Sequence, residues 1–186
     1  VTISAGAITA VTDKRNLSVM FGRGIHVAQY GAQGRGTDES TQINNAIVAA
    51  EQSGGVVYIG EEHSAHTYTV TNEILIHGDR IRLVGLGRNT TINLNAASKA
   101  AIRMSRSNGG IENLTITCTN TLANTVGLQV SPTAAEIAAR TLTQQNYNVF
   151  RNLSISNCSD GIKLQTGPRA VSGADSGIFY NGFYDI

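Results

Sequence analysis

The 186-residue sequence is poor in charge, in cysteine and in proline. Asp, Glu, Lys and Arg make up only 15% of it, and the formal net charge is +1. A nearly neutral chain gives no basis for binding nucleic acid or an anionic membrane. No apolar run approaches the roughly 18 residues of a membrane span, so we expect no membrane insertion. Val1 begins no signal-peptide pattern.

Only two cysteines are present, Cys118 and Cys158, which is too few to define a disulfide framework. We expect both to be reduced residues of the core, with a disulfide between them as the second option. The 2 prolines and 20 glycines favour a β-rich chain with many tight turns over a helical bundle or a disordered tail. The length fits one domain with a sizeable core.

One amphipathic helix is predicted between Asp38 and Gln52. Its apolar residues recur at the spacing that places one helix face against a core, and they are Ile43, Ala46, Ile47 and Ala50. Residues that can cap it are Thr37, Asp38 or Ser40 at the N-terminus and Gly54 at the C-terminus. The residues from 131 to 140 predict a second, short helix, with Ser131 as N-cap and Pro132 in its first turn. We interpret this second helix as a loop insertion.

Most of the remaining chain consists of short β runs bounded by Gly, Asn, Asp or Ser. A degenerate repeat begins at residues 111, 150 and 183, where Ile111–Ile116 matches Phe150–Ile155 and Phe183–Ile186 matches the opening. A period of tens of residues with short strands is typical of a solenoid whose coils stack around a continuous apolar column. Alternation predicts that Leu114, Ile116, Leu153 and Ile155 point inward, and that Thr115, Thr117, Ser154 and Ser156 point outward. Asn120 and Asn157 are predicted turn residues.

A motif from Val27 onward carries a family resemblance. It reads V-x-x-Y-G-A-x-G-x-G-x-D-x-x-x-x-I-x-x-A-I, followed by G-G-V-V-Y-I and Thr67–Val70. It resembles the start of the pectate-lyase-like β-helix superfamily, which includes phage tailspikes and polysaccharide lyases and hydrolases. The resemblance implies an all-β fold, a right-handed single-stranded parallel β-helix (solenoid) with an N-terminal capping α-helix.

The predicted domain organisation follows from this resemblance. Residues 1–26 form a neck or linker, and residues 27–186 form the N-terminal part of the β-helix domain. Because Ile186 falls inside the third copy of the repeat, we expect the domain to be truncated at its C-terminal end.

The resemblance also implies a function, with alternatives left open. The first is a phage tailspike or tail fibre protein in the virion tail, a homotrimer that binds and depolymerises a host surface polysaccharide such as capsule or O-antigen. Other phage tail or baseplate proteins are then possible partners. The second is a secreted polysaccharide lyase or glycoside hydrolase, and the third is a structural or adhesive β-helix without turnover. No cofactor and no nucleic-acid partner is implied.

Few residues suggest chemistry. Hydrolysis of a glycoside needs two acids facing one groove, and Asp160 and Asp175 are the candidates for that catalytic pair. Arg103 and Arg151 are candidates for binding an acidic glycan. No catalytic motif of the family matches residue by residue, and we expect the catalytic residues to lie beyond this chain.

Two other patterns are better explained by structure. The glycines at 31, 34 and 36 before a helix could hold a phosphate, but the Lys–Ser/Thr end of a P-loop is missing, which favours a capping turn. His63 and His66, beside Glu61 and Glu62, lie in a predicted polar loop without a third placed ligand, so we predict no metal site.

Overall fold

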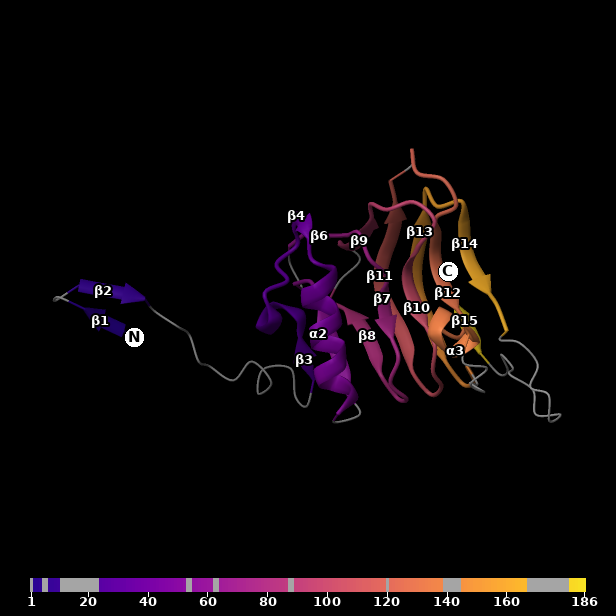
Figure 1. The fold of residues 1–186 in the computed structure, drawn as a ribbon, viewed down its shortest axis with the longest axis horizontal. Helices are drawn as coiled ribbons and strands as arrows, with labels where there is room; N and C mark the ends of the chain where they lie inside the picture. Colours follow the sequence, from indigo (N-terminus) through magenta and orange to yellow (C-terminus); the bar gives the residue numbers. More distant parts are fainter. Residues whose placement is uncertain are drawn as a thin grey trace.

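The computed structural model describes residues 2–4, 7–10, 24–52, 55–61, 64–86, 89–119, 121–138, 145–166 and 181–186. The described part of the chain is mostly β-strand with few helices (Figure 1). Its strands are β1 (Thr2–Ser4), β2 (Ala7–Ala10), β3 (Ile25–His26), β4 (Arg35–Asp38), β5 (Val56–Ile59), β6 (His66–Val70), β7 (Ile74–Ile76), β8 (Arg82–Gly85), β9 (Thr90–Leu94), β10 (Ala100–Met104), β11 (Gly110–Cys118), β12 (Val126–Val130), β13 (Val149–Ser156), β14 (Asp160–Leu164) and β15 (Gly182–Tyr184). Its helical segments are η1 (Val27–Tyr30), α2 (Ser40–Glu51) and α3 (Ala134–Ala138).

Apart from an antiparallel pair of β1 and β2, all pairings between named strands are parallel and form three columns. Column A contains β3, β5, β8, the first halves of β11 and β13, and β15. Column B contains β4, β6, β9 and the second halves of β11 and β13. Column C contains β7, β10, β12 and β14. Because β11 and β13 belong to both A and B, these two columns form one bent sheet.

The predicted repeat is confirmed by the register of β11 with β13. Ile111 pairs with Phe150, Leu114 with Leu153, and Ile116 with Ile155. Phe150 pairs in turn with Phe183 of β15, and their rings stack 4.9 Å apart. The inward residues of β11 are buried and its threonines are half-buried, as alternation predicts.

The bend between columns A and B is made by residues with left-handed backbone. Asn113, Asn152 and Asp185 have φ values of 58°, 50° and 50°, a conformation that Asn and Asp tolerate better than other side chains. The Asn152 amide donates a hydrogen bond of 3.0 Å to the Asn113 amide oxygen one strand away. The predicted turn at Asn157 is confirmed by its φ of 60°, whereas Asn120 lies outside the described residues.

Helix α2 confirms the predicted amphipathic helix. Its apolar stripe of Ile43, Ala46, Ile47 and Ala50 is fully buried in the core. At its N-terminus the Asp38 carboxylate accepts from the Ser40 amide at 3.1 Å and from the Ser40 hydroxyl. The first parallel strand, β3, pairs with β5 and begins at Ile25, just before the predicted domain boundary.

The polar side chains of α2 also close the free edge of column C at β7. The Asn44 amide oxygen accepts from the Leu75 N–H at 2.9 Å, and its NH₂ donates to the Glu73 carbonyl at 2.9 Å. The Glu51 carboxylate accepts from the His77 N–H at 3.1 Å. The Ser40 hydroxyl accepts from the amides of residues 71 and 72, each at 3.0 Å. Side chains thus replace the backbone partners of a missing neighbouring strand.

Among the described residues, three Arg–Glu ion pairs join strands, their flanking loops and helix α3. Arg82 on β8 pairs with Glu112 on β11, Glu73 before β7 pairs with Arg103 on β10, and Arg106 after β10 pairs with Glu136 on α3. The last pair fixes α3 against the sheet. The predicted short helix is therefore present, but its cap differs, because Thr133 and Glu136 form a reciprocal capping box instead of Ser131 capping the helix.

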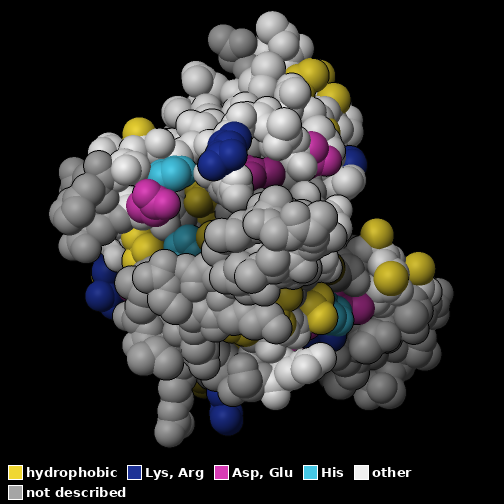
Figure 2. Space-filling model, turned by 90° about the vertical axis from the view of Figure 1, so that its left-hand side faces the viewer, with side chains coloured by type: hydrophobic (Ala, Val, Ile, Leu, Met, Phe, Trp, Pro, Cys, Tyr) yellow, Lys and Arg dark blue, Asp and Glu magenta, His cyan; other side chains and the backbone are white. Residues whose placement is uncertain are grey.

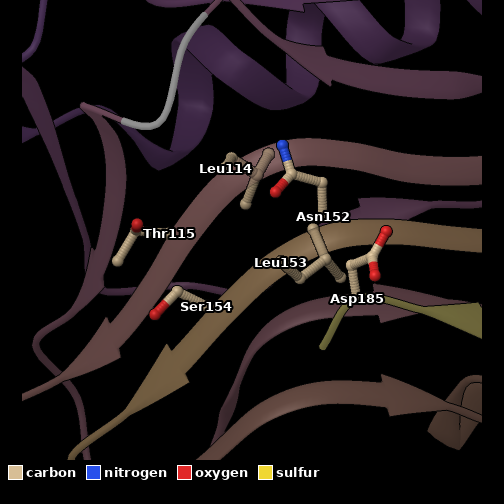
Figure 3. A pocket seen from close by; sticks show the side chains of 6 residues that line it. All are labelled: Leu114, Thr115, Asn152, Leu153, Ser154 and Asp185. Carbon is tan, nitrogen blue, oxygen red and sulfur yellow. The ribbon is translucent and has the colours of Figure 1, made fainter.

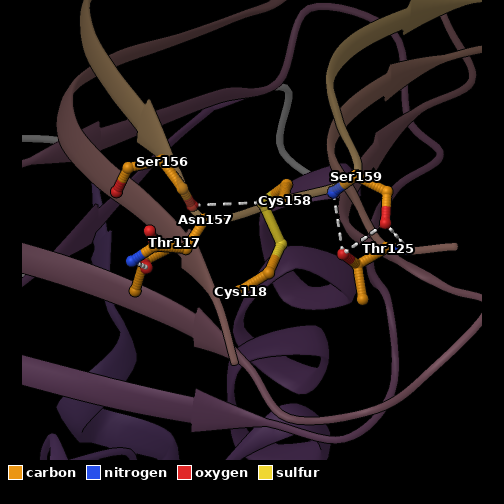
Figure 4. The surroundings of a disulfide bond; sticks show 7 residues. All are labelled: Thr117, Cys118, Thr125, Ser156, Asn157, Cys158 and Ser159. Carbon is orange, nitrogen blue, oxygen red and sulfur yellow. Dashed lines mark hydrogen bonds between the residues drawn. A yellow bond between two sulfur atoms is a disulfide. The ribbon is translucent and has the colours of Figure 1, made fainter. Parts of the chain in front are cut away.

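The expectation of reduced cysteines was wrong, because Cys118 and Cys158 form a disulfide (Figure 4). Cys118 ends β11 inside the core, and Cys158 lies in the turn that follows β13. Beside it, the Thr125 and Ser159 side chains exchange hydrogen bonds with each other's backbone amides at 3.2 and 3.1 Å. Covalent and polar contacts together fasten the β13–β14 corner to the β11–β12 corner.

The structure confirms a mostly β chain with parallel sheets, whereas a complete right-handed β-helix stays a prediction. The proposed Gly54 cap lies outside the described residues.

The edge closure by α2 predicts unequal effects for two neighbouring asparagines. Asn44→Ala should lower the free energy of unfolding by about 1–3 kcal/mol, because the Glu73 carbonyl and the Leu75 N–H lose their partners. Asn45→Ala gains the same helix propensity at an exposed site and should stay within about 0.5 kcal/mol of the wild type. Urea denaturation of both variants measures this, and equal effects would contradict the edge-closing role.

The disulfide predicts a stability that depends on reductant. It closes a loop with a sequence separation of 40, for which the chain-entropy relation gives about 4 kcal/mol. Urea denaturation of the wild type should therefore shift to lower urea when a reductant is added. The double variant Cys118→Ala/Cys158→Ala should show no such shift, and a shift in that variant would rule out the disulfide as its cause.

Candidate functional site

An open groove of 690 Å³ runs between helices α2 and α3, and its floor is the outer side of column C. Its lining includes the apolar side chains of Val48 and Leu75 and four charged ones, Glu51, Glu73, Lys99 and Arg103. Two carboxylates and two cations balance one another, so the groove carries no net charge from these residues. Its volume lies in the range typical of small-molecule sites.

Arg103, one of the two predicted binding residues, lies in this groove and is held by Glu73. Two guanidinium nitrogens donate to the two Glu73 carboxylate oxygens, each at 2.7 Å, and a third donates to the Ser131 hydroxyl at 2.6 Å. Burial alone would raise the pKa of Glu73, but the hydrogen bonds and charge of Arg103 outweigh it and lower the pKa. Glu73 is therefore ionised at neutral pH and unsuited to act as a general acid.

Lys99 differs from Arg103 because it donates hydrogen bonds to uncharged groups. Its ammonium group donates to the Thr71 carbonyl at 3.0 Å and to the Asn72 amide oxygen at 2.6 Å. These contacts fix the ammonium group at the rim of the groove, where it can donate a further hydrogen bond to a ligand.

His77, at one end of the groove, is placed next to Ser105 but does not activate it. The His77 Nδ1 lies 3.0 Å from the Ser105 hydroxyl, and its Nε2 lies 3.1 Å from the Arg106 guanidinium. Ser105 is fully buried, so a substrate has no access to its hydroxyl. The Ser–His contact is therefore structural.

The other predicted site residues lie elsewhere. Arg151 is exposed on the outer face of column A, in register with Glu112 and Tyr184. Asp160 is exposed at the start of β14 in column C, and Asp175 lies outside the described residues. The structure thus does not bring Arg151 into the groove with Arg103, and the proposed pair of acids stays a prediction.

The glycine loop after η1 is occupied by the protein's own carboxylate. Glu39 is buried and accepts from the Gln33 amide at 2.5 Å and from the Gly34 amide at 3.0 Å. Gly34 and Gly36 have φ values of 67° and 85°. The amide groups that could have bound a phosphate therefore bind Glu39, which supports the capping interpretation.

At the end of the loop between β5 and β6, His66 is paired with Glu61. His66 Nε2 lies 3.3 Å from a Glu61 carboxylate oxygen, and its Nδ1 lies 3.1 Å from the Gln33 carbonyl. Glu62 and His63 lie outside the described residues. Among those described, no cluster of three or more His, Cys, Asp or Glu residues is arranged to hold a metal ion.

A second, smaller hollow of 350 Å³ lies at the bend between columns A and B (Figure 3). It is lined by Leu114, Thr115, Asn152, Leu153, Ser154 and Asp185. Thr115 and Ser154 are neighbours in register on β11 and β13. The residues bring hydroxyl, amide and carboxylate groups together over an apolar floor.

The surface seen from the α2 end of the molecule has mixed charge. Among the described residues in that view, basic and acidic side chains lie singly or near one another (Figure 2). This distribution agrees with the net charge of +1. Within the described residues, none of the helices has the length and apolarity to cross a membrane.

A comparison with known proteins shows a similarity in fold. No family model matches the chain, and no curated protein matches it. A solved structure of ORF18 from Geobacillus virus E2 is similar, with a TM-score of 0.57 over 83% of this chain and 23% sequence identity. The chain spans 32% of the length of that protein. The similarity shows a shared fold, whereas a phage origin and membership of the pectate-lyase-like superfamily stay predictions.

The arrangement of the groove suits binding better than bond cleavage. Glu51 and Glu73 share it, a pair that the sequence did not reveal because they come from α2 and from the loop before β7. Both carboxylates accept backbone hydrogen bonds, from His77 and Ala100 respectively. Amide, ammonium and carboxylate groups beside an apolar strip can bind a polar, hydroxyl-bearing ligand.

The Glu73–Arg103 pair predicts a pH-dependent effect. Because the folded pKa of Glu73 is lowered, its contribution to stability is present above about pH 4.5 and is lost as pH falls through the folded pKa. Arg103→Met should therefore cost about 1–3 kcal/mol at pH 7 and less at pH 3. Urea denaturation at both pH values measures this, with Glu73→Gln/Arg103→Met as the matched control. An equal loss at both pH values would contradict the assignment.

Proposed function

We propose that this chain is part of a virion-associated phage protein, built on a right-handed parallel β-helix, that binds a host surface polysaccharide through the groove between α2 and α3. The observation that carries the proposal is the similarity in fold to the phage protein ORF18 over most of the chain. Depolymerisation of the polysaccharide, assembly as a homotrimer and a place in the virion tail belong to the same proposal.

The order of strands supports the β-helix. Along the chain, β5, β6 and β7 enter columns A, B and C in turn, and β8, β9 and β10 do the same. Strand β11 then supplies both A and B before β12 enters C, and β13 and β14 repeat this. A chain that visits three columns in a fixed order, with parallel pairing at each, is expected of a solenoid.

The disulfide supports a location outside the cytoplasm. Disulfides persist in oxidising surroundings, including virion and cell surfaces, and are rare in the cytosol. The pair Cys118–Cys158 therefore fits a protein that functions on a released particle.

The groove supports a carbohydrate ligand. Val48 and Leu75 form an apolar strip that can contact the C–H face of a sugar ring, and the surrounding amides and charged groups can bind its hydroxyls. Glu73 is held ionised by Arg103, so it does not supply the general acid that glycoside hydrolysis needs. The depolymerisation in this proposal, in a phage or in a secreted enzyme, would therefore use residues outside the groove.

Substitution of Val48 tests the groove. Val48 is 53% exposed, so Val48→Lys should leave the fold intact while it places a charged chain across the apolar strip. Binding of the full-length protein to an array of bacterial capsular and O-antigen polysaccharides should weaken at least tenfold. Asn45→Lys, on the same helix outside the groove lining, should bind as the wild type does. Unchanged binding by the Val48 variant, or no binding by the wild type, would refute the proposal.

A further inference from the structure

Two rows of small polar side chains cover the outer face of column B. One row contains residues that pair in register on β6, β9, β11 and β13, namely Thr67, Thr91, Thr115 and Ser154. The other contains Thr69, Asn93, Thr117 and Ser156. All eight are exposed or half-buried, and seven of them carry a hydroxyl group.

The rows form a regular array because the strands beneath them are fixed. The residues between them, Tyr68, Ile92 and Ile116, are buried in the core. Neighbouring strands lie about 4.8 Å apart, and residues two apart on a strand lie about 6.6 Å apart. The outer face therefore repeats the same polar groups at nearly constant spacing along the stack.

Among the described residues of β6, β9, β11 and β13, neither row contains a charged side chain. Charged residues in register with the rows are Arg35 and Asp38 on β4, at one end. At the other end lies Asp185, in the smaller hollow. An acidic polymer laid along the rows would meet no cation among the eight side chains that form them. An uncharged, hydroxyl-rich chain would meet groups that can both donate and accept hydrogen bonds.

The smaller hollow continues this face. Thr115 and Ser154 belong both to the first row and to the lining of the hollow, and Asn152 and Asp185 complete the polar part of that lining (Figure 3). A carboxylate has two oxygens and accepts up to four hydrogen bonds. Asp185 can therefore bind two adjacent hydroxyls of one sugar ring, with Leu114 and Leu153 below the ring.

We infer that the outer face of column B and its hollow form a second carbohydrate-contact surface, specific for an uncharged segment of a polysaccharide. One sugar ring occupies the hollow, and the following rings lie along the rows. This inference rests on the proposed polysaccharide binding and gives that function a second surface and a ligand class.

The test uses the full-length protein and the double variant Thr115→Val/Ser154→Ala. Valine favours the strand conformation, so the variant removes two hydroxyls without opposing the fold, and circular dichroism checks this. The probes are printed bacterial polysaccharides, one set uncharged and one set with uronic or sialic acids. The wild type should bind members of the uncharged set, and the double variant should bind them at least tenfold more weakly. Thr41→Val, at an exposed position of α2, is the matched control and should change nothing.

The outcomes separate this inference from the proposed function. Loss of binding in Val48→Lys with unchanged binding in Thr115→Val/Ser154→Ala would overturn the second surface and leave the groove. Binding by the wild type to the acidic set alone would overturn the assigned ligand class. Binding to neither set would overturn both proposals.

Discussion

The termination of column C by helix α2 is the constraint on which the parallel stack depends. A strand at the edge of a parallel sheet presents unpaired N–H and C=O groups, which invite pairing with another chain. In this protein, Asn44 and Glu51 supply those groups with partners from the same helix that buries Ile43 and Ile47 in the core. One helix therefore closes the apolar interior and the hydrogen-bonded edge at once. The strands β10, β12 and β14 can then add in order from a protected start.

Both candidate surfaces follow from this arrangement. The groove exists because α2 crosses the edge of column C and α3 stands over the next part of it, held by Arg106 and Glu136. The hydroxyl rows exist because the same alternation recurs on four strands in register. Binding surfaces on such a scaffold are repeated or interrupted by loop insertions without a change in the core. The outward side chains of this chain can therefore change without a change in the buried core.

Local patterns in the sequence predicted much of the fold. The stripe of α2, the short β runs and the repeat at Ile111, Phe150 and Phe183 all depend on spacing within a few residues or on direct similarity. The repeat also contained an unused signal for the disulfide. Cys118 corresponds to Asn157 in the register of β11 with β13, so Cys158 is expected one residue from its level.

The rest required the three-dimensional arrangement. The Glu73–Arg103 pair joins the loop before β7 to the neighbouring strand β10. No local sequence pattern marks Glu73 as the partner of Arg103. A phosphate loop also needs backbone amides that have no other partner, and glycine spacing does not reveal this. Here Glu39, the residue before α2, folds back and accepts hydrogen bonds from those amides. Such contacts depend on how the fold positions a loop relative to distant strands, and the residue types alone do not determine that.

The three Arg–Glu pairs have a consequence for the fidelity of folding. The main-chain hydrogen bonds between parallel strands are nearly the same for every pair in a column. They therefore do not distinguish the correct neighbouring strand from the next strand of that column. Each ion pair instead joins two particular segments that follow one another in the stack. The pairs are Arg82–Glu112, Glu73–Arg103 and Arg106–Glu136. If a strand paired with the wrong neighbour, these carboxylates would lose their counterions. Burial of an unpaired carboxylate is unfavourable. The ion pairs therefore favour the pairing of each strand with its correct neighbour.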